Sequence, residues 1–177
     1  LRQIAASAES VYRVRLLSMN YLLQADRDAY QSSIAISQAL NIAIKSGGTG
    51  EEIDKLVAAV NENYGQIGQR FNKFKALHLE HGGEKVPEFS QFDDNYAPMD
   101  AYTQQIISLI KEGRTAEAGS IYNTSYNEAF GKARDAMDKL TQVTETVAEE
   151  EFNSILAANY RGKILSIVSV IVTTIIL

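Results

Sequence analysis

The sequence predicts an all-α protein, an antiparallel up-down-up-down four-helix bundle whose two outer helices are long and whose last helix continues into an apolar C-terminal run. Two prolines and eleven glycines among 177 residues favour helices. Apolar residues recur at helical spacing, and no stretch alternates as a strand does. The expected helix lengths are long, short, short, long, which is typical of a bundle that enters a membrane at both ends.

The first helix is expected over residues 1–46, which contain no Gly or Pro. One apolar stripe fits the inside of the bundle: Leu22, Ala25, Ala29, Ile36, Leu40 and Ala43. A second stripe lies beside it: Leu16, Leu23, Arg27, Tyr30 and Ile34. Two stripes indicate two partners, and a second copy of the chain fits the second one. Glycines from Gly47 to Gly50 end the helix, since they accept the left-handed conformation of a C-terminal cap.

The second and third helices form the shorter hairpin. Residues 51–81 carry a sustained heptad that indicates coiled-coil-like packing: Ile53, Val57, Val60, Tyr64, Ile67, Phe71 and Phe74. A loop at 82–88 precedes the third helix, expected over residues 90–112 with Ser90 as its cap. Pro98 predicts either a kink or a restart within it.

The fourth helix is expected to run unbroken over residues 115–161. Its apolar stripe changes phase at Glu149, Glu150 and Glu151, which we interpret as a solvated face. Residues 1–163 are therefore expected to form the bundle.

Residues 164–177 are expected to be the start of a second transmembrane helix. They contain no charge, no Gly and no Pro, but a full span needs about 20 apolar residues. The alternative is a buried C-terminal helix of a soluble protein. The matched outer helices also predict a first membrane helix upstream of Leu1.

Composition excludes several functions. A net charge of -5 argues against nucleic acid, which needs a basic face. Without cysteine there is no disulfide and no thiol chemistry. His78 and His81 lack the Glu-x-x-His pattern of bundle metal sites. We therefore expect no metal, no cofactor and no enzymatic activity.

The candidate site lies where charges interrupt the first helix. Arg27 is nineteen residues before Ser46, and Arg134 is nineteen after Thr115, so they are expected at the same height. A polar layer of Arg27, Asp28, Arg134, Asp135 and Asp138 would then lie below phenols and amides. The candidate ligand-binding residues are Arg27, Tyr30, Gln31, Tyr126, Asn127, Phe130 and Arg134. The alternative is an internal Arg–Asp network that only fixes helix register.

Three stretches carry a family resemblance: Leu22-Leu-Gln-Ala-Asp-Arg-Asp-Ala-Tyr-Gln31, Lys111-Glu-Gly-Arg-Thr-Ala-Glu-Ala118 and the apolar run. With the helix lengths, they resemble the periplasmic four-helix-bundle sensor domain of bacterial methyl-accepting chemotaxis receptors. The resemblance implies a homodimer in the bacterial inner membrane with this domain in the periplasm. It also implies a small ligand (amino acid, organic acid or amine) and a small displacement of the fourth helix. That displacement would reach a kinase complex through a cytoplasmic region absent from this sequence.

Two rival functions share this helical layout. One is the sensor module of a membrane histidine kinase, and the other is a ligand-free bundle that docks a periplasmic binding protein. The acidic neighbours of Arg27 also leave amines and neutral molecules open as ligands.

Overall fold

The computed structural model describes residues 11–47 and 50–176, and throughout these residues it contains helices and no strand. A π-helical turn η1 (Val11–Arg15) leads into α2 (Leu16–Ser46), which is followed by α3 (Glu51–Glu80) and α4 (Pro87–Lys111). The fourth helical segment comprises α5 (Thr115–Ile121), the π-helical turn η2 (Tyr122–Tyr126) and α6 (Asn127–Ile176). The all-α four-helix bundle predicted from the sequence is confirmed.

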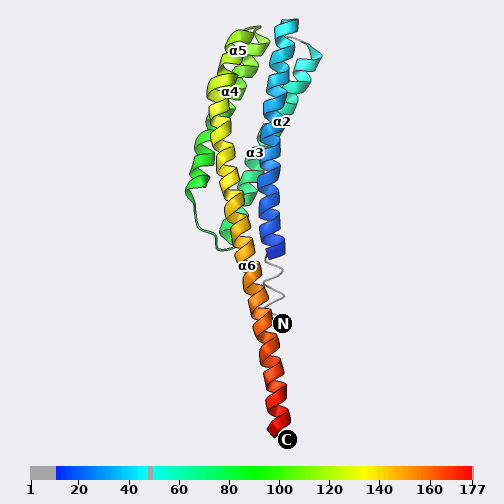
Figure 1. The fold of residues 1–177 in the computed structure, drawn as a ribbon. Helices are drawn as coiled ribbons and strands as arrows, with labels where there is room; N and C mark the ends of the chain where they lie inside the picture. Colours follow the sequence, from blue (N-terminus) through cyan, green and yellow to red (C-terminus); the bar gives the residue numbers. More distant parts are fainter. Residues whose placement is uncertain (1–10, 48–49, 177) are drawn as a thin grey trace.

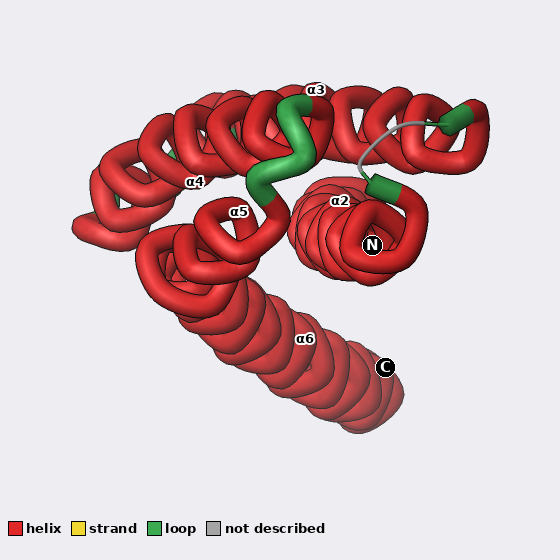
Figure 2. Tube along the Cα trace, turned by 90° about the horizontal axis from the view of Figure 1, so that it is seen from above, coloured by secondary structure: helices red, strands yellow, loops and turns green. Residues whose placement is uncertain are grey.

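The helices alternate in direction, and the fourth segment extends far past the other three (Figure 1). Along the bundle axis, α3 lies beside α2, and α4 lies beside α5 and α6 (Figure 2). The lower end of α6 therefore projects alone among the described helices, as a rod that begins in the bundle and leaves it.

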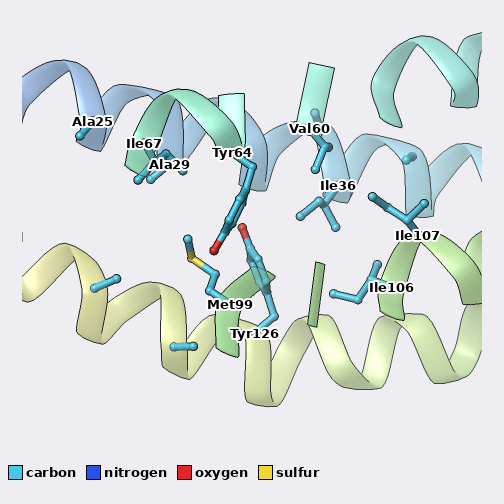
Figure 3. Packing of buried hydrophobic residues seen from close by; sticks show 14 of the residues in the cluster. Ala25, Ala29, Ile36, Val60, Tyr64, Ile67, Met99, Ile106, Ile107 and Tyr126 are labelled. Atoms are coloured by element: carbon cyan, nitrogen blue, oxygen red, sulfur yellow. The ribbon is translucent and has the colours of Figure 1, made fainter. Parts of the chain in front are cut away.

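Apolar side chains from all four helical segments fill the core. In Figure 3, Tyr64 of α3 and Tyr126 of η2 point toward each other between the layers, next to Met99. Further along the axis, Ile36, Val60 and Ile106 meet in the same interior (Figure 3). The heptad predicted for α3 is confirmed, because Ile53, Val57, Val60, Tyr64, Ile67, Phe71 and Phe74 are all buried.

Aromatic stacking joins α3 to α4. The rings of Phe71 and Phe92 are stacked, and the rings of Tyr64 and Tyr96 are stacked with centroids 4.7 Å apart. Each tyrosine hydroxyl also donates a hydrogen bond to the other's backbone carbonyl. Gly68 makes this possible, since a Cβ there would lie 2.7 Å from the Tyr96 hydroxyl oxygen.

The third helix begins earlier than predicted. The sequence placed its start at residue 90 with Ser90 as cap, but α4 starts at Pro87. Val86 is extended (φ -113°, ψ 154°), as a residue before proline prefers, and Pro87 suits the first turn because it has no N–H to satisfy. The helix then continues through Pro98.

The fourth helical segment contains a π turn that the sequence did not predict. Ala118 and Tyr126 are both buried, yet they are eight residues apart. In a regular α-helix eight residues overshoot two turns by about 80°. The wider π turn at Tyr122–Tyr126 takes up the extra residue, so both side chains face the core.

The apolar run is helical as expected. The helix α6 continues without interruption through Gly162 to Ile176. Within the part of the chain that the structure describes, no helix is long and apolar enough to cross a membrane. The start of the predicted first helix, residues 1–10, lies outside the described residues.

A buried ion pair fixes α2 against α3. Asp28 is fully buried and is bound by Arg70, whose guanidinium also donates to the carbonyl of Gln24 at 3.1 Å and to Gln66 at 3.0 Å. Arg27 reaches the other carboxylate oxygen of Asp28 at 3.2 Å from the exposed side. The sequence had predicted that Asp28 lies in one polar layer with Arg134. The prediction did not include Arg70, which reaches Asp28 from α3.

Removing Arg70 is expected to destabilise the bundle strongly, because it leaves the Asp28 carboxylate buried with only an exposed partner. We predict that Arg70→Ala lowers the free energy of unfolding by about 3–5 kcal/mol. The matched control is Arg27→Ala, which removes a half-exposed partner of the same carboxylate and is expected to cost less than about 1 kcal/mol. Urea denaturation followed by circular dichroism measures both. Equal small losses would contradict this role for Arg70.

Candidate functional site

A cluster of charged and aromatic side chains lies between α2 and α6, around Arg134. Its Nε donates to Oδ1 of Asp26 at 2.5 Å, and its Nη2 donates to Oδ2 at 3.3 Å. Its guanidinium carbon lies 4.0 Å from the ring centroid of Tyr30 and 5.6 Å from that of Phe130. Both Arg134 and Asp26 are about three-quarters buried, at 22% and 24% exposed. Asp26 and Arg134 therefore form a short ion pair against an aromatic surface.

A ladder of aromatic rings continues from this ion pair toward the distal end. Tyr122, Tyr126 and Phe130 are four residues apart and stack at centroid separations of 5.3 and 5.9 Å. Phe130 also meets the ring of Tyr30 edge-on at 5.7 Å. The hydroxyl of Tyr122 lies 3.1 Å from Oγ of Ser33, so both ends of the ladder are bound to α2.

The structure brings together four of the seven predicted site residues: Tyr30, Tyr126, Phe130 and Arg134. The other three, Arg27, Gln31 and Asn127, are exposed, and Arg27 is engaged by Asp28. Sequence reasoning missed Asp26 as the partner of Arg134. Its position four residues from Leu22 and from Tyr30 was the available signal, since residues at that spacing share a helix face.

The remaining residues of the predicted polar layer are engaged elsewhere. Asp135 is exposed and binds Lys139 at 2.7 Å and the amide of Gln91 at 2.9 Å. Asp138 is exposed, and its negative charge acts on Arg134. The predicted single layer is thus divided into three groups centred on Asp26, Asp28 and Asp135.

The electrostatics of the cluster follow from its burial. Partial burial by itself would lower the pKa of the Arg134 guanidinium, but the hydrogen bonds and charge of Asp26 outweigh this effect and raise it. Burial raises the pKa of Tyr126 well above its usual value, and hydrogen bonding to Ser33 opposes the rise only in part. Arg134 therefore stays a cation and Tyr126 stays neutral at physiological pH.

The two histidines bind backbone carbonyls. Nε2 of His78 lies 3.0 Å from the carbonyl oxygen of Glu84, and Nδ1 of His81 lies 3.0 Å from that of Leu77. Among the described residues, no group of three His, Cys, Asp or Glu side chains is placed to hold a metal ion.

Glu151 is not simply part of a solvated face, as the sequence suggested for the three consecutive glutamates. Its carboxylate accepts two hydrogen bonds from Arg15, from Nη2 at 2.8 Å and from Nε at 3.1 Å. Arg15 is 12% exposed. This bidentate ion pair joins the last residue of η1, directly before α2, to α6.

The second stripe predicted on the first helix is exposed along α2. Its large apolar members Leu16, Leu23, Tyr30 and Ile34 are 45–58% exposed. Farther along α2, Ile44 was not part of the predicted stripe and is 65% exposed. Leu16, Leu23 and Tyr30 are seven residues apart and Ile34 follows Tyr30 by four, which is the spacing of a helix–helix seam. Two open grooves flank its ends, one of about 430 Å³ beside Asn41 and Lys55 and one of about 560 Å³ beside Leu16 and Asn20.

Comparison with known protein families gives one finding. Residues 1–157 match the model of a "Four helix bundle sensory module for signal transduction". The match covers the bundle and includes every residue of the Arg134 cluster, and it confirms the resemblance to a chemoreceptor sensor domain. Among curated proteins and among solved structures, none matches this chain.

The raised pKa of the buried Tyr126 predicts that the folded protein loses stability at alkaline pH. In the unfolded chain Tyr126 loses its proton above about pH 10, while folded Tyr126 keeps it, so unfolding becomes more favourable as pH rises. The stabilisation is complete below pH 10 and falls by about 1.4 kcal/mol per pH unit above it for each such group. Tyr126→Phe should reduce this slope, and Tyr160→Phe, at a 69% exposed position, should not. Urea midpoints between pH 9 and 11.5 measure the slopes; equal slopes in both variants would refute the assignment.

Proposed function

The chain belongs to the family of four-helix-bundle sensory modules for signal transduction, and from this premise we propose that it is the extracytoplasmic sensor domain of a transmembrane chemoreceptor. The observation that carries the proposal is the length of the fourth helical segment. The helix α6 (Asn127–Ile176) contains Arg134, reaches the apolar residues at 164–176 without a break and extends beyond the other helices (Figure 1). In this proposal the domain is periplasmic and the receptor is in the bacterial inner membrane.

The rod gives the proposal a mechanism. A ligand at the Arg134 cluster would contact α2 and α6 together, because Asp26 and Tyr30 belong to α2 while Phe130 and Arg134 belong to α6. Any change in how these helices meet shifts α6 against α2. Since α6 is unbroken to Ile176, a small axial shift arrives at its apolar end. From there it would pass to a cytoplasmic region that controls a kinase complex.

The ligand proposed for this cluster is a small molecule: an amino acid, an organic acid or an amine. Tyr30 and Phe130 provide apolar walls, and Arg134 and Asp26 provide opposite charges. Arg27, Gln31 and Asn127 are exposed on α2 and α6, and in this proposal they would make outer contacts to the ligand.

A homodimer is proposed to form through the exposed stripe of α2. Its apolar members stand at the spacing of a two-helix seam, and Ile34 and Leu23 are each more than half exposed. A second copy of α2 would cover these side chains with an identical stripe, as a two-fold interface requires. Tyr30 belongs both to the stripe and to the Arg134 cluster, so dimerisation and ligand binding would share a residue.

A charge in the centre of the stripe should disrupt the dimer. We predict that Ile34→Glu raises the dimer dissociation constant at least tenfold, because two like charges would face each other in an apolar seam. Leu79→Glu is the matched control, an exposed leucine at the end of α3 and outside the stripe. Sedimentation equilibrium of residues 1–177 in detergent measures both. A monomeric wild-type chain, or equal effects of the two variants, would reject this interface.

A ligand screen tests the sensor function. Amino acids, organic acids and amines are added to the chain and thermal stability is recorded; a ligand at 100 times its dissociation constant adds about 2.7 kcal/mol. Tyr30→Ala should weaken any binder at least tenfold, whereas Tyr160→Ala should not. In a chimera with a chemoreceptor's cytoplasmic region, the same binder should alter kinase activity. A binder that leaves kinase activity unchanged would refute the receptor function.

A further inference from the structure

The groups around Arg134 have the chemistry of a binding site for a cation. A guanidinium lies 4.0 Å above the face of Tyr30 and 5.6 Å from the ring of Phe130, and it is hydrogen-bonded by both oxygens of Asp26. Aromatic faces attract cations through their negative π-surface, and a carboxylate completes the charge balance. The side chain that fills this site belongs to the protein itself.

The charges facing the site favour a cation over an anion. Asp26 contacts Arg134 from α2, and Asp138 acts on it from α6. If Arg134 moved out, two carboxylates and two aromatic rings would remain. Asp26 accepts from only Nε and Nη2 of Arg134, so an anion could reach the remaining N–H groups, but it would then lie near the like charges of Asp26 and Asp138.

Of the two side chains in the Asp26–Arg134 ion pair, that of Arg134 is the one that can move out of the site. Its long flexible side chain can carry its charge into water, whereas the short side chain of Asp26 keeps the carboxylate beside α6. In the single chain Tyr30 is 45% exposed, so its ring can be reached from solvent when the stripe of α2 is not covered by a second copy. The Lys75–Asp93 pair differs in this respect, because the rings beside Lys75 belong to the buried Phe71 and Phe89.

We propose that this cluster binds a small organic cation, a guanidinium or an ammonium compound, which takes the place of the Arg134 side chain between Tyr30, Phe130 and Asp26. The proposal names the ligand class of the site in the proposed function and rests on it. It also supplies the trigger, because such a ligand replaces an ion pair between α2 and α6 by one between α2 and the ligand. α6 is thereby released from Asp26.

Chemical rescue of an emptied site tests the proposal. In residues 1–177 carrying Arg134→Ala, methylguanidinium at low millimolar concentration, below denaturing levels, should bind saturably and raise the melting temperature. The wild-type chain should bind it at least tenfold more weakly, because Arg134 competes. Tetramethylammonium in a parallel titration distinguishes ammonium from guanidinium preference. Isothermal titration calorimetry and thermal unfolding are the readouts, with circular dichroism to verify helicity.

Matched variants decide whether the binding is at this site. Arg134→Ala/Asp26→Asn and Arg134→Ala/Tyr30→Leu should each lose at least tenfold in affinity for the better probe. Arg27→Ala should gain no saturable binding, because Arg27 is paired with an aspartate but is 56% exposed. Helical Arg134→Ala protein that binds neither probe, or binding that survives both double variants, would overturn the proposal. If Arg134→Ala is not helical, the wild-type chain is titrated against Asp26→Asn, and equal affinities would overturn it.

The ligand screen separates this proposal from the sensor function. For a cationic ligand, Arg134→Ala should strengthen binding, because it removes the internal competitor. For an organic acid held by the guanidinium, the same variant should weaken binding. A screen that finds only acids, with affinity lost in Arg134→Ala, refutes the cation site while leaving the sensor function intact.

Discussion

The charged turn of α2 at Asp26–Asp28 sets the arrangement of the other helices. Its two carboxylates point to opposite neighbours: the fully buried Asp28 binds Arg70 of α3, and the mostly buried Asp26 binds Arg134 of α6. A carboxylate taken out of water must be paired, and each pair is geometrically specific. One turn of one helix therefore determines how α2 is aligned with both the short hairpin and the long rod. The pair with α3 is buried on its carboxylate side, and the pair with α6 is the one at which we propose that a ligand binds.

The π turns orient the side chains of the fourth helical segment toward the core and toward α2. Tyr122–Tyr126 accommodates one residue more than a regular helix would allow, and so Ala118 and Tyr126 both reach the core while Phe130 and Arg134 face α2. Toward the C-terminal part of α6, Glu151 forms an ion pair with Arg15, the last residue of η1. The α2–α6 contact is thus held at two heights, by Asp26–Arg134 and by Arg15–Glu151. In the proposed mechanism, a ligand that opens the Asp26–Arg134 contact would leave the Arg15–Glu151 contact in place.

Periodicity in the sequence was enough to predict the helices and most of their buried faces. The heptad of α3, the inner stripe of α2 and the end of α2 at Gly47 all depend on local patterns. Prediction failed where a partner is distant in sequence. Arg70 is 42 residues from Asp28, Asp26 is 108 from Arg134, and Arg15 is 136 from Glu151. Matching heights between the first and fourth helices found Arg134 but not which aspartate it binds, because that depends on helix rotation. The π turn that sets this rotation has no signature beyond an eight-residue spacing.

The proposed signalling route requires one uninterrupted helix from the Arg134 cluster to the apolar residues at 164–176. Hydrogen–deuterium exchange of residues 1–177 in lipid nanodiscs tests this continuity most directly, since amide protection reports local opening of helical hydrogen bonds. A continuous rod predicts slow exchange from Asn127 through Gly162 into the apolar run. A fast-exchanging break between about residues 158 and 165 would contradict it, because a displacement at Arg134 would then be lost before it reached the end of the rod.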